Sequence, residues 1–322
     1  MITLSKIAQL AHVSVSTASK AFSMSSEVSE QTRQEIFRIA KEYGCFKKFY
    51  NARYPKYVVA VICPEFHGRH YSGMVAALQD ELRSRNCEMC VASTDFSEET
   101  ERSLPEYYHN YANVDGIIMI GGKVPISESY EIPVVSVVPN CRHPIGICLR
   151  VDYRQALTQL VGHFQAEGIG PIGFISERYT LGKLQVFRQV MKKAGLPCQH
   201  VVTGGRFEQG GYRSMEKLLA AEDRPRAVVC AYDHLAIGAI RCLADHGLSV
   251  PEDIAIVGMD NIPEAEYLIP TLSSIDFCIE ETCRRAAESI VDLIGGSDRI
   301  TSHTVTADLI LRESSYLPQQ DA

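Results

Sequence analysis

Several features that would mark other classes of protein are missing from the sequence. It holds no run of about 18 apolar residues, so we expect no membrane-spanning helix. No apolar stretch follows Lys6 near the start, so we expect no secretory signal peptide. The 11 cysteines include one Cys-x-x-Cys pair, Cys87 and Cys90, without the second pair that a zinc site requires. We interpret the cysteines as reduced, packed thiols of a cytoplasmic protein, and we expect no metal site.

The signatures of the common catalytic sites are missing as well. There is no Gly-x-Ser-x-Gly elbow, no His-Glu-x-x-His motif, no phosphate-binding P-loop, and no Gly-x-Gly-x-x-Gly after an expected strand. We therefore expect neither an enzyme nor a bound cofactor. An α/β enzyme ranks third among the alternatives, and assays for turnover of candidate sugars would reveal it.

Charge is unevenly distributed along the 322 residues. Residues 1–56 carry nine Lys and Arg against four Glu, a balance of +5, and the whole chain carries −7, so the remainder carries −12. A basic head on an acidic body fits a head that meets phosphate groups and a body that does not.

The first 22 residues have the pattern of two short helices. Apolar side chains recur at helical spacing within 4–11, and Thr3 stands where an N-cap would stand. A second helix, with small and hydroxyl side chains, is expected within 15–22 after the cap residue Ser14. Two such helices joined by a tight turn are typical of a helix-turn-helix, whose second helix enters the DNA major groove. Two surface helices of an ordinary bundle would give the same pattern, so the pattern alone leaves both readings open.

The segment from Thr3 to Ser23, TLSKIAQLAHVSVSTASKAFS, resembles the N-terminal signature of the LacI/GalR family of transcriptional regulators. That signature runs approximately T-L-x-D-I-A-x-x-A-G-V-S-x-x-T-V-S-R-V-L-N. The chain departs from it at Lys6, His12, Ala18, Lys20 and Ser23. His12 replaces the glycine of the turn between the helices at a cost in backbone strain. Lys20 keeps the charge of an arginine but lacks the two-pronged guanidinium that recognises guanine best.

The resemblance implies a sequence-specific transcription factor, in particular a repressor, that binds a near-palindromic double-stranded DNA operator as a homodimer. On the recognition helix it implies base contacts by Val15, Ser16 and Lys20. Phosphate contacts are expected from Thr3, Ser14, Thr17 and Ser19.

A third helix is expected after Ser29, with Ile36 and Ile39 closing a small core over Ile7 and Phe22. Gly44 would end this helix, because glycine readily adopts the left-handed conformation found after a helix C-terminus. The predicted DNA-binding domain is therefore 1–44.

Residues 45–56, CFKKFYNARYPK, form the predicted hinge or linker. In the family, a G-Y-x-P-N-x-x-A-R-x-L pattern forms a hinge helix whose leucine enters the minor groove. Here Ala52 and Arg53 match, whereas the stretch that follows is about four residues short and Pro55 would end a helix. Two interpretations stay open, a basic tether or an aromatic wedge supplied by Phe49, Tyr50 or Tyr54. We include Ala52, Arg53 and Tyr54 among the predicted DNA-binding residues.

After residue 56 the pattern changes to alternating strands and helices. Buried parallel strands are expected at 58–62, 88–93, 116–120, 133–138, 172–176, 200–204, 227–231 and 254–259, with helices at 153–167, 182–195, 210–221 and 233–247. Two successive series of this kind predict two doubly wound α/β lobes with a cleft between them. The segments VPEDIAIVGMDN and PTLSSI resemble the family's effector-binding core, which is like periplasmic sugar-binding proteins.

The resemblance extends over nearly the whole chain and implies an effector-binding domain at 57–322. Its N-terminal lobe would comprise about 57–150 and 277–303, and its C-terminal lobe about 151–276 and 304–318. The chain would thus cross between the lobes three times. The implied partner is a small-molecule effector, a carbohydrate or a sugar derivative.

Candidate effector-binding residues follow the carboxyl ends of the expected strands, where α/β proteins bind ligands. The resemblance assigns ligand contacts to Tyr71, Lys183, Phe207, Tyr232, Asp233 and Asp260. A turn cap is the alternative role for Asp260, and solvated surface is the alternative for Tyr71 and Lys183. Arg69, His70 and Arg178 are weaker candidates. Convergence of several of these groups would suit an anionic or phosphorylated ligand better than a plain sugar.

A second functional class stays open beside the regulator. A cytoplasmic sugar-binding module whose head no longer binds DNA would explain the atypical hinge. The basic head argues against it. The sequence specifies neither the effector nor the operator.

Overall fold

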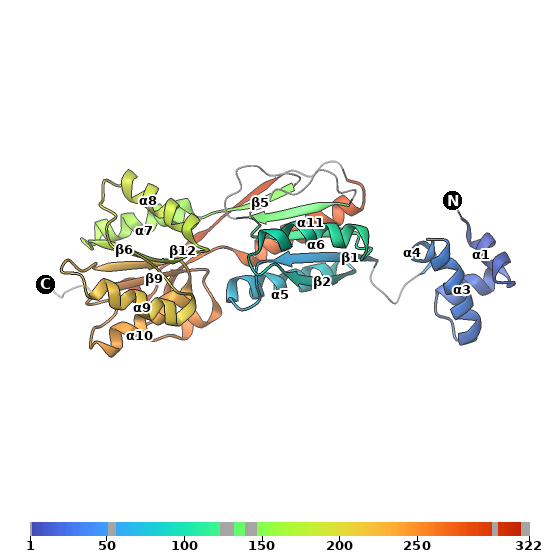
Figure 1. The fold of residues 1–322 in the computed structure, drawn as a ribbon, viewed down its shortest axis with the longest axis horizontal. Helices are drawn as coiled ribbons and strands as arrows, with labels where there is room; N and C mark the ends of the chain where they lie inside the picture. The colour runs from blue at the N-terminus through green and yellow to red at the C-terminus, as the bar shows by residue number, and fades with distance from the viewer. Residues whose placement is uncertain (1, 51–55, 123–131, 139–146, 298–301, 317–322) are drawn as a thin grey trace.

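The computed structural model describes residues 2–50, 56–122, 132–138, 147–297 and 302–316. A small helical head is followed by two α/β lobes, which confirms the predicted fold class (Figure 1). The head comprises α1 (Leu4–Leu10), α2 (Val15–Phe22), α3 (Glu30–Glu42) and α4 (Phe46–Phe49). Within the described residues, no helix is long and apolar enough to cross a membrane.

Hydroxyl side chains cap the first three helices of the head, as predicted. Thr3, Ser14 and Ser29 accept hydrogen bonds from backbone N–H groups three residues later, at 3.3, 3.0 and 3.2 Å. These bonds satisfy donors that have no partner within the helix. His12 turns the chain between α1 and α2 with φ +55°, in the left-handed region that a glycine would occupy without strain.

The head extends further than predicted, because α4 packs back onto it. The Phe46 ring lies 4.9 Å from Phe37, Phe49 lies 5.7 Å from Phe22, and Tyr50 lies 5.0 Å from Phe37, measured between ring centroids. Phe49 and Tyr50 therefore belong to the aromatic core of the head rather than to a free linker. Ala52, Arg53 and Tyr54 lie outside the described residues, so their roles stay predictions.

The N-terminal lobe is built on a six-stranded sheet in which all described pairings are parallel, with strand order β11-β5-β4-β3-β1-β2. Alternate residues of β1 face opposite layers. Val59 and Val61 pack with α5 and α11 on one face, and Ala60 and Ile62 pack on the other face, where Leu104 of α6 lies. The elements are β1 (Tyr57–Cys63), α5 (Arg69–Ser84), β2 (Cys87–Ser93), α6 (Glu98–Asn110), β3 (Gly116–Ile120), β4 (Val134–Val138), β5 (Ile147–Asp152), α11 (Ile279–Ile294) and β11 (His303–Thr306).

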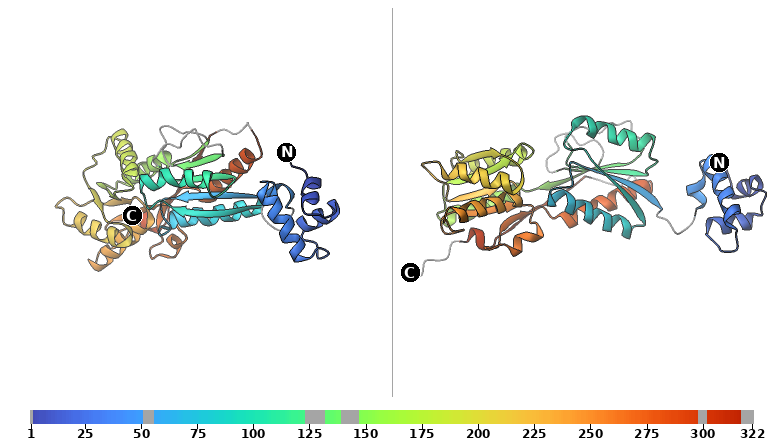
Figure 2. Two further views of the ribbon diagram at one scale, coloured as in Figure 1. Left: turned by 45° about the vertical axis from the view of Figure 1, so that its right-hand side comes forward. Right: turned by 60° about the horizontal axis from the view of Figure 1, so that its bottom comes forward.

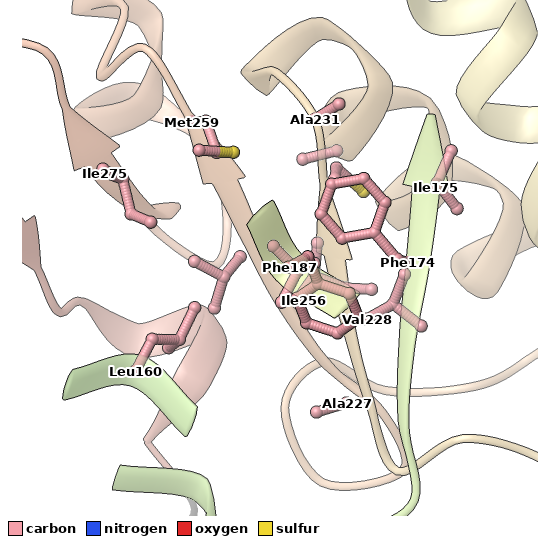
Figure 3. Packing of buried hydrophobic residues seen from close by; sticks show 14 of the residues in the cluster. Leu160, Phe174, Ile175, Phe187, Ala227, Val228, Ala231, Ile256, Met259 and Ile275 are labelled. Atoms are coloured by element: carbon pink, nitrogen blue, oxygen red, sulfur yellow. The ribbon is translucent and has the colours of Figure 1, made fainter. Parts of the chain in front are cut away.

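The C-terminal lobe holds a second six-stranded sheet, ordered β12-β10-β9-β8-β6-β7. Figure 3 shows its core, in which the rings of Phe174 and Phe187 lie 4.7 Å apart beside Val228 and Ile256. The elements are α7 (Arg154–Ala166), β6 (Ile172–Glu177), α8 (Leu181–Lys193), β7 (Val201–Gly204), α9 (Phe207–Leu219), β8 (Ala227–Cys230), α10 (Asp233–Asp245), β9 (Ala255–Met259), η1 (Pro263–Tyr267), β10 (Ser273–Asp276), β12 (Asp308–Ile310) and η2 (Glu313–Ser315).

The chain passes between the lobes three times, after β5, after β10 and after β11. Figure 2 shows the result from two directions: α11, although late in the sequence, lies in the N-terminal lobe. The predicted lobe limits at residues 150 and 303 are too early, because β5 continues to Asp152 and β11 only begins at His303. The segments that join the lobes are only one or two residues long and include the buried residues Tyr153, Phe277 and Ala307, so the pattern of apolar residues does not mark the limits of the lobes.

The two cysteines of the Cys-x-x-Cys pair lie on β2, and both are free thiols. Cys87 is buried in the core beneath α5, and Cys90 packs with the cluster on the opposite face. Their role in strand packing is as predicted.

Candidate functional site

A cavity of about 300 Å³ lies between the two lobes and is lined by residues of both. Its polar lining comes mainly from the carboxyl ends of strands: Glu65 follows β1, Glu177 ends β6, and Asp260 follows β9. Parallel strands deliver these side chains to one edge of each sheet. A site of this size and placement is typical of a small-molecule pocket.

The first polar group in the cavity is an ion pair between Lys183 and Asp260. Lys183, on α8, donates from Nζ to Oδ1 of Asp260 at 3.1 Å and to the carbonyl oxygen of Ala231 at 2.8 Å. The ammonium also lies 4.4 Å from the centroid of the Phe277 ring. Asp260 is buried and has φ +106°, a conformation that L-residues rarely adopt and that is often found at functional sites.

His70 and Tyr71 of α5 reach this pair from the other lobe. Nδ1 of His70 lies 3.4 Å from Oδ1 of Asp260. Burial lowers the pKa of His70, so the ring is neutral near pH 7. Burial, followed by the charges of Asp260 and Glu65, raises the pKa of the Tyr71 hydroxyl, which therefore stays protonated.

A second ion pair joins the lobes directly. Arg206, which follows β7, donates from Nη2 to Oε1 of Glu65 at 2.7 Å. Across the same cleft, the rings of Phe96 and Tyr179 stack with centroids 3.7 Å apart and planes 11° from parallel. Both rings line the cavity and are partly exposed, so they form part of its wall toward solvent.

Phe207 and Tyr232 complete the wall on the C-terminal lobe. The backbone N–H of Phe207 donates to the hydroxyl oxygen of Tyr232 at 2.9 Å. Phe207 has φ +57°, and its ring lies 6.3 Å from that of Tyr232 in an edge-on arrangement. The hydrogen bond holds both aromatic residues at the start of α9 and α10.

The structure brings together five of the six predicted effector-binding residues in this cavity: Tyr71, Lys183, Phe207, Tyr232 and Asp260. Asp233 is the exception, because it is fully buried and does not line the cavity. It accepts hydrogen bonds from the Ser274 hydroxyl at 2.7 Å and from the Ile262 N–H at 2.8 Å. Its side chain therefore ties the loop after β9 to strand β10. Of the weaker candidates, Arg69 and His70 line the cavity and Arg178 does not.

Prediction from the sequence missed Phe96, Glu177, Tyr179, Arg206 and Phe277 as lining residues. Glu177, Arg206 and Phe277 lie at or just after the ends of β6, β7 and β10, so the strand-end rule could have found them. Tyr179 and Phe96 also follow strands, β6 and β2, but no local pattern predicts that their rings stack between the lobes.

The charges in the cavity do not favour an anion. The three lining cations each have a carboxylate partner: Lys183 has Asp260, Arg206 has Glu65, and Arg69 has Glu264 at 2.5 Å. Glu177 adds a further buried carboxylate, whose pKa is raised by burial. The arrangement does not support the expectation of an anionic or phosphorylated ligand, because no lining cation of the described chain is left to neutralise one.

Among the described residues of the head, the predicted DNA-contacting side chains lie on the outside. Val15, with 46% of its surface exposed, and Ser16 and Ser19 are solvent-exposed on α2, whereas Ala18 and Phe22 are buried. The remaining predicted residues, Thr3, Ser14, Thr17 and Lys20, are exposed or half-buried. Lys20 forms an ion pair with Glu27.

Two family models match the chain. The model for bacterial regulatory proteins of the lacI family matches residues 3–45, and a periplasmic binding protein-like domain matches residues 161–315. The HTH-type transcriptional repressor PurR of Klebsiella pneumoniae (strain 342) is 27% identical, with 85% of each chain covered.

Two solved structures cover almost all of the chain. A complex of the transcriptional regulator CelR with cellobiose has 26% identity and a TM-score of 0.71, covering 98% of this chain and 100% of that one. The lac repressor dimer bound to operator and the anti-inducer ONPF has 18% identity and a TM-score of 0.77, covering 98% and 99%. The latter likeness concerns the fold alone.

Proposed function

This chain belongs to the LacI family of bacterial regulatory proteins, and we propose that it is a transcriptional repressor controlled by a small carbohydrate. One observation carries the proposal: an exposed hydroxyl-bearing helix of a basic head is joined to a body that holds a polar, aromatic-lined cavity between two lobes. Such a protein would act on DNA in the cytoplasm. No catalytic step is assigned to the cavity.

We propose that α2 enters the major groove of the operator. Val15 and Ser16 would contact base edges together with Lys20, and the hydroxyls of Thr3, Ser14, Thr17 and Ser19 would contact phosphates. Short side chains let a helix approach the groove closely. Lys20 would exchange Glu27 for DNA on binding, because the two side chains pair at an exposed site where an ion pair is weak.

We propose a neutral carbohydrate as the effector. Carboxylates accept hydrogen bonds from hydroxyl groups, and the cavity offers Glu65, Glu177 and Asp260 for this purpose. Aromatic rings supply flat apolar surface for the C–H faces of a sugar ring, and Tyr71 and Phe207 are placed to do so. The CelR relative is solved with cellobiose, which supports the chemical class.

We propose that the protein acts as a homodimer. Two apolar side chains of the C-terminal lobe stand out into solvent, Tyr267 with 84% and Ile269 with 95% of their surface exposed. Adjacent exposed apolar side chains of this kind are typical of a protein interface. A two-fold dimer would present two heads to two half-sites of a near-palindrome.

Selection from random duplex DNA with the purified full-length protein tests this function. The expected result is an enriched near-palindrome, whose enrichment changes when a mixture of neutral sugars is added. Absence of any enriched sequence, with and without the sugars, would overturn the DNA-binding function and favour a sugar-binding module.

A further inference from the structure

Glu65 and Arg206 form the ion pair that joins the two lobes, and we propose that this pair is a specificity-determining subsite that binds one hydroxyl group of the effector. The inference rests on the proposed function, because it requires a ligand in the cavity. It goes further by naming two residues, one from each lobe, and the chemical group that they select.

Each partner keeps one buried polar atom that the ion pair does not use. Glu65 bonds Arg206 through Oε1, whereas its Oε2 is buried without a partner among the described residues. Arg206 donates from Nη2, whereas its Nε is likewise buried without a partner there. Both atoms are closed to water although both residues line the cavity, so a ligand hydroxyl reaches them when the two side chains shift slightly toward it. A buried polar atom without a partner is costly, so a ligand that satisfies it gains affinity.

The two unused atoms are one acceptor and one donor. A hydroxyl group matches this combination, because its hydrogen can go to the Glu65 carboxylate while its oxygen accepts from the Arg206 N–H. A carboxylate or a fully ionised phosphate group has no hydrogen to donate to Glu65. It would also meet the negative charge of Glu177, which lines the same cavity and interacts with both Glu65 and Arg206. The subsite therefore selects a neutral hydroxyl over an anion.

Both side chains are held in place before any ligand arrives. The guanidinium carbon of Arg206 lies 4.5, 5.2 and 5.4 Å from the ring centroids of Phe207, Phe96 and Tyr179. Gly68 leaves room for Glu65, because a Cβ at that position would lie 2.9 Å from Oε1. Little side-chain entropy remains to be lost on binding, which favours affinity.

A hydroxyl in this subsite would contact both lobes at once. Glu65 follows β1 in the N-terminal lobe, and Arg206 follows β7 in the C-terminal lobe. The contact is made only while the ion pair holds the lobes together. The effector therefore favours the arrangement in which the two lobes are in contact at Glu65 and Arg206 over one in which they are apart. A ligand shifts such an equilibrium because it binds one of the two states better.

Thermal-shift titration of the full-length protein with defined sugars tests the subsite. The probes are D-glucose, D-galactose, D-ribose and cellobiose, with D-glucose 6-phosphate and D-ribose 5-phosphate as anionic counterparts. We expect at least one neutral sugar to raise the Tm and neither phosphate to do so. Glu65→Gln should weaken binding of that sugar about tenfold or more, as loss of a hydrogen bond to a charged group does. Arg206→Lys serves as the second variant should Glu65→Gln fail to fold.

The matched control is Glu264→Gln. It breaks a further ion pair between the lobes, with Arg69, but Glu264 does not line the cavity. This variant should bind the sugar like the wild type. Monodeoxy derivatives of the same sugar identify the hydroxyl that the subsite binds. One derivative should bind the wild type more weakly than the parent sugar does. The same derivative and the parent sugar should bind Glu65→Gln equally well, because the hydroxyl no longer contributes there.

The subsite would be overturned by unchanged sugar affinity in both Glu65→Gln and Arg206→Lys, by an equal loss of affinity in Glu264→Gln, or by a Tm shift with the phosphates alone. Failure of every neutral sugar would overturn it too. The DNA selection distinguishes these results from failure of the proposed DNA-binding function, because enrichment of an operator depends on the head and not on the Glu65–Arg206 subsite. A protein that selects an operator but ignores the sugars keeps its DNA-binding function, and one that binds a sugar through Glu65 without selecting DNA keeps the subsite.

Discussion

The ammonium of Lys183 lies 3.1 Å from the carboxylate of Asp260, so a cation of α8 is paired inside the cavity with the acid that follows β9. Both side chains are largely buried, with 15% and 7% of their surface exposed. Asp260 uses one oxygen for Lys183, which leaves the other available to ligand hydroxyls. Both residues of this pair were predicted from the sequence as ligand contacts, and both line the cavity.

Replacement of Asp260 by Ala should abolish the Tm increase that a bound sugar causes, because the variant loses the central acceptor for ligand hydroxyls. The unliganded variant should also unfold more easily, since Lys183 loses its buried partner. Thermal-shift titration with the sugar that binds the wild type measures both effects. Asp292→Ala, which removes an exposed carboxylate of α11, is the control. If the sugar raised the Tm of Asp260→Ala as much as that of the wild type, Asp260 would not be a ligand-binding residue.

Replacement of Asp233 by Asn should change how stability depends on pH. Burial, followed by the charge of Asp260, raises the pKa of Asp233 to about 8, against about 4 in an unfolded chain. Between these values the unfolded chain is ionised at this residue while the folded chain keeps its proton. The contribution of Asp233 to the free energy of unfolding is therefore complete below about pH 4 and declines as the pH rises toward 8.

Urea unfolding of the wild type and Asp233→Asn at pH 5 and pH 7.5 measures this dependence. The free energy of unfolding of the variant minus that of the wild type should be larger at pH 7.5 than at pH 5, because the wild type loses stability over this range and the variant does not. A difference that is constant or that changes in the opposite direction would show that Asp233 is ionised in the folded protein.

Replacement of His12 by Gly should stabilise the head by about 1 kcal/mol, because glycine adopts a positive φ without the clash of a Cβ atom. His12 has φ +55° in the turn between α1 and α2. Hydrogen exchange of the backbone amides in α1 and α2 gives the local opening free energy. His12→Ala is the control, since alanine keeps the strain. Equal protection in the two variants would show that the turn is not strained.

Replacement of Phe49 by Ala should destabilise the head by about 2 kcal/mol, as loss of a half-buried ring does. Its ring lies 5.7 Å from Phe22, which anchors α2 in the core. Amide exchange in α3 should become faster, and operator affinity should fall. Gln31→Ala, which changes an exposed residue of α3, should do neither. Unchanged amide exchange in Phe49→Ala would show that α4 does not stabilise the head and acts only as a linker.

The sequence predicts the elements well because their patterns are local. Caps at Thr3, Ser14 and Ser29 depend on neighbouring residues, and the strands depend on short apolar runs. Phe46, Phe49 and Tyr50 also have the local spacing of one helix face, which the hinge pattern of the family does not contain.

The cavity was only partly predictable, because it depends on how distant segments meet. Asp233 and Asp260 both follow a strand, yet the first faces Ser274 beneath the cavity and the second faces the ligand space. Gly258 permits this, since a Cβ there would lie 1.9 Å from the Asp233 carboxylate. Glu65 and Arg206 are 141 residues apart, and they meet because the two lobes lie against each other.

The most direct test of the account measures coupling between the head and the cavity. Operator affinity should be measured by fluorescence anisotropy at fixed salt concentration, with and without a saturating neutral sugar, for the wild type and Asp260→Ala. We predict that the sugar changes the operator Kd of the wild type about tenfold and leaves that of Asp260→Ala unchanged. A sugar that binds the wild type with no change in operator affinity would contradict the account.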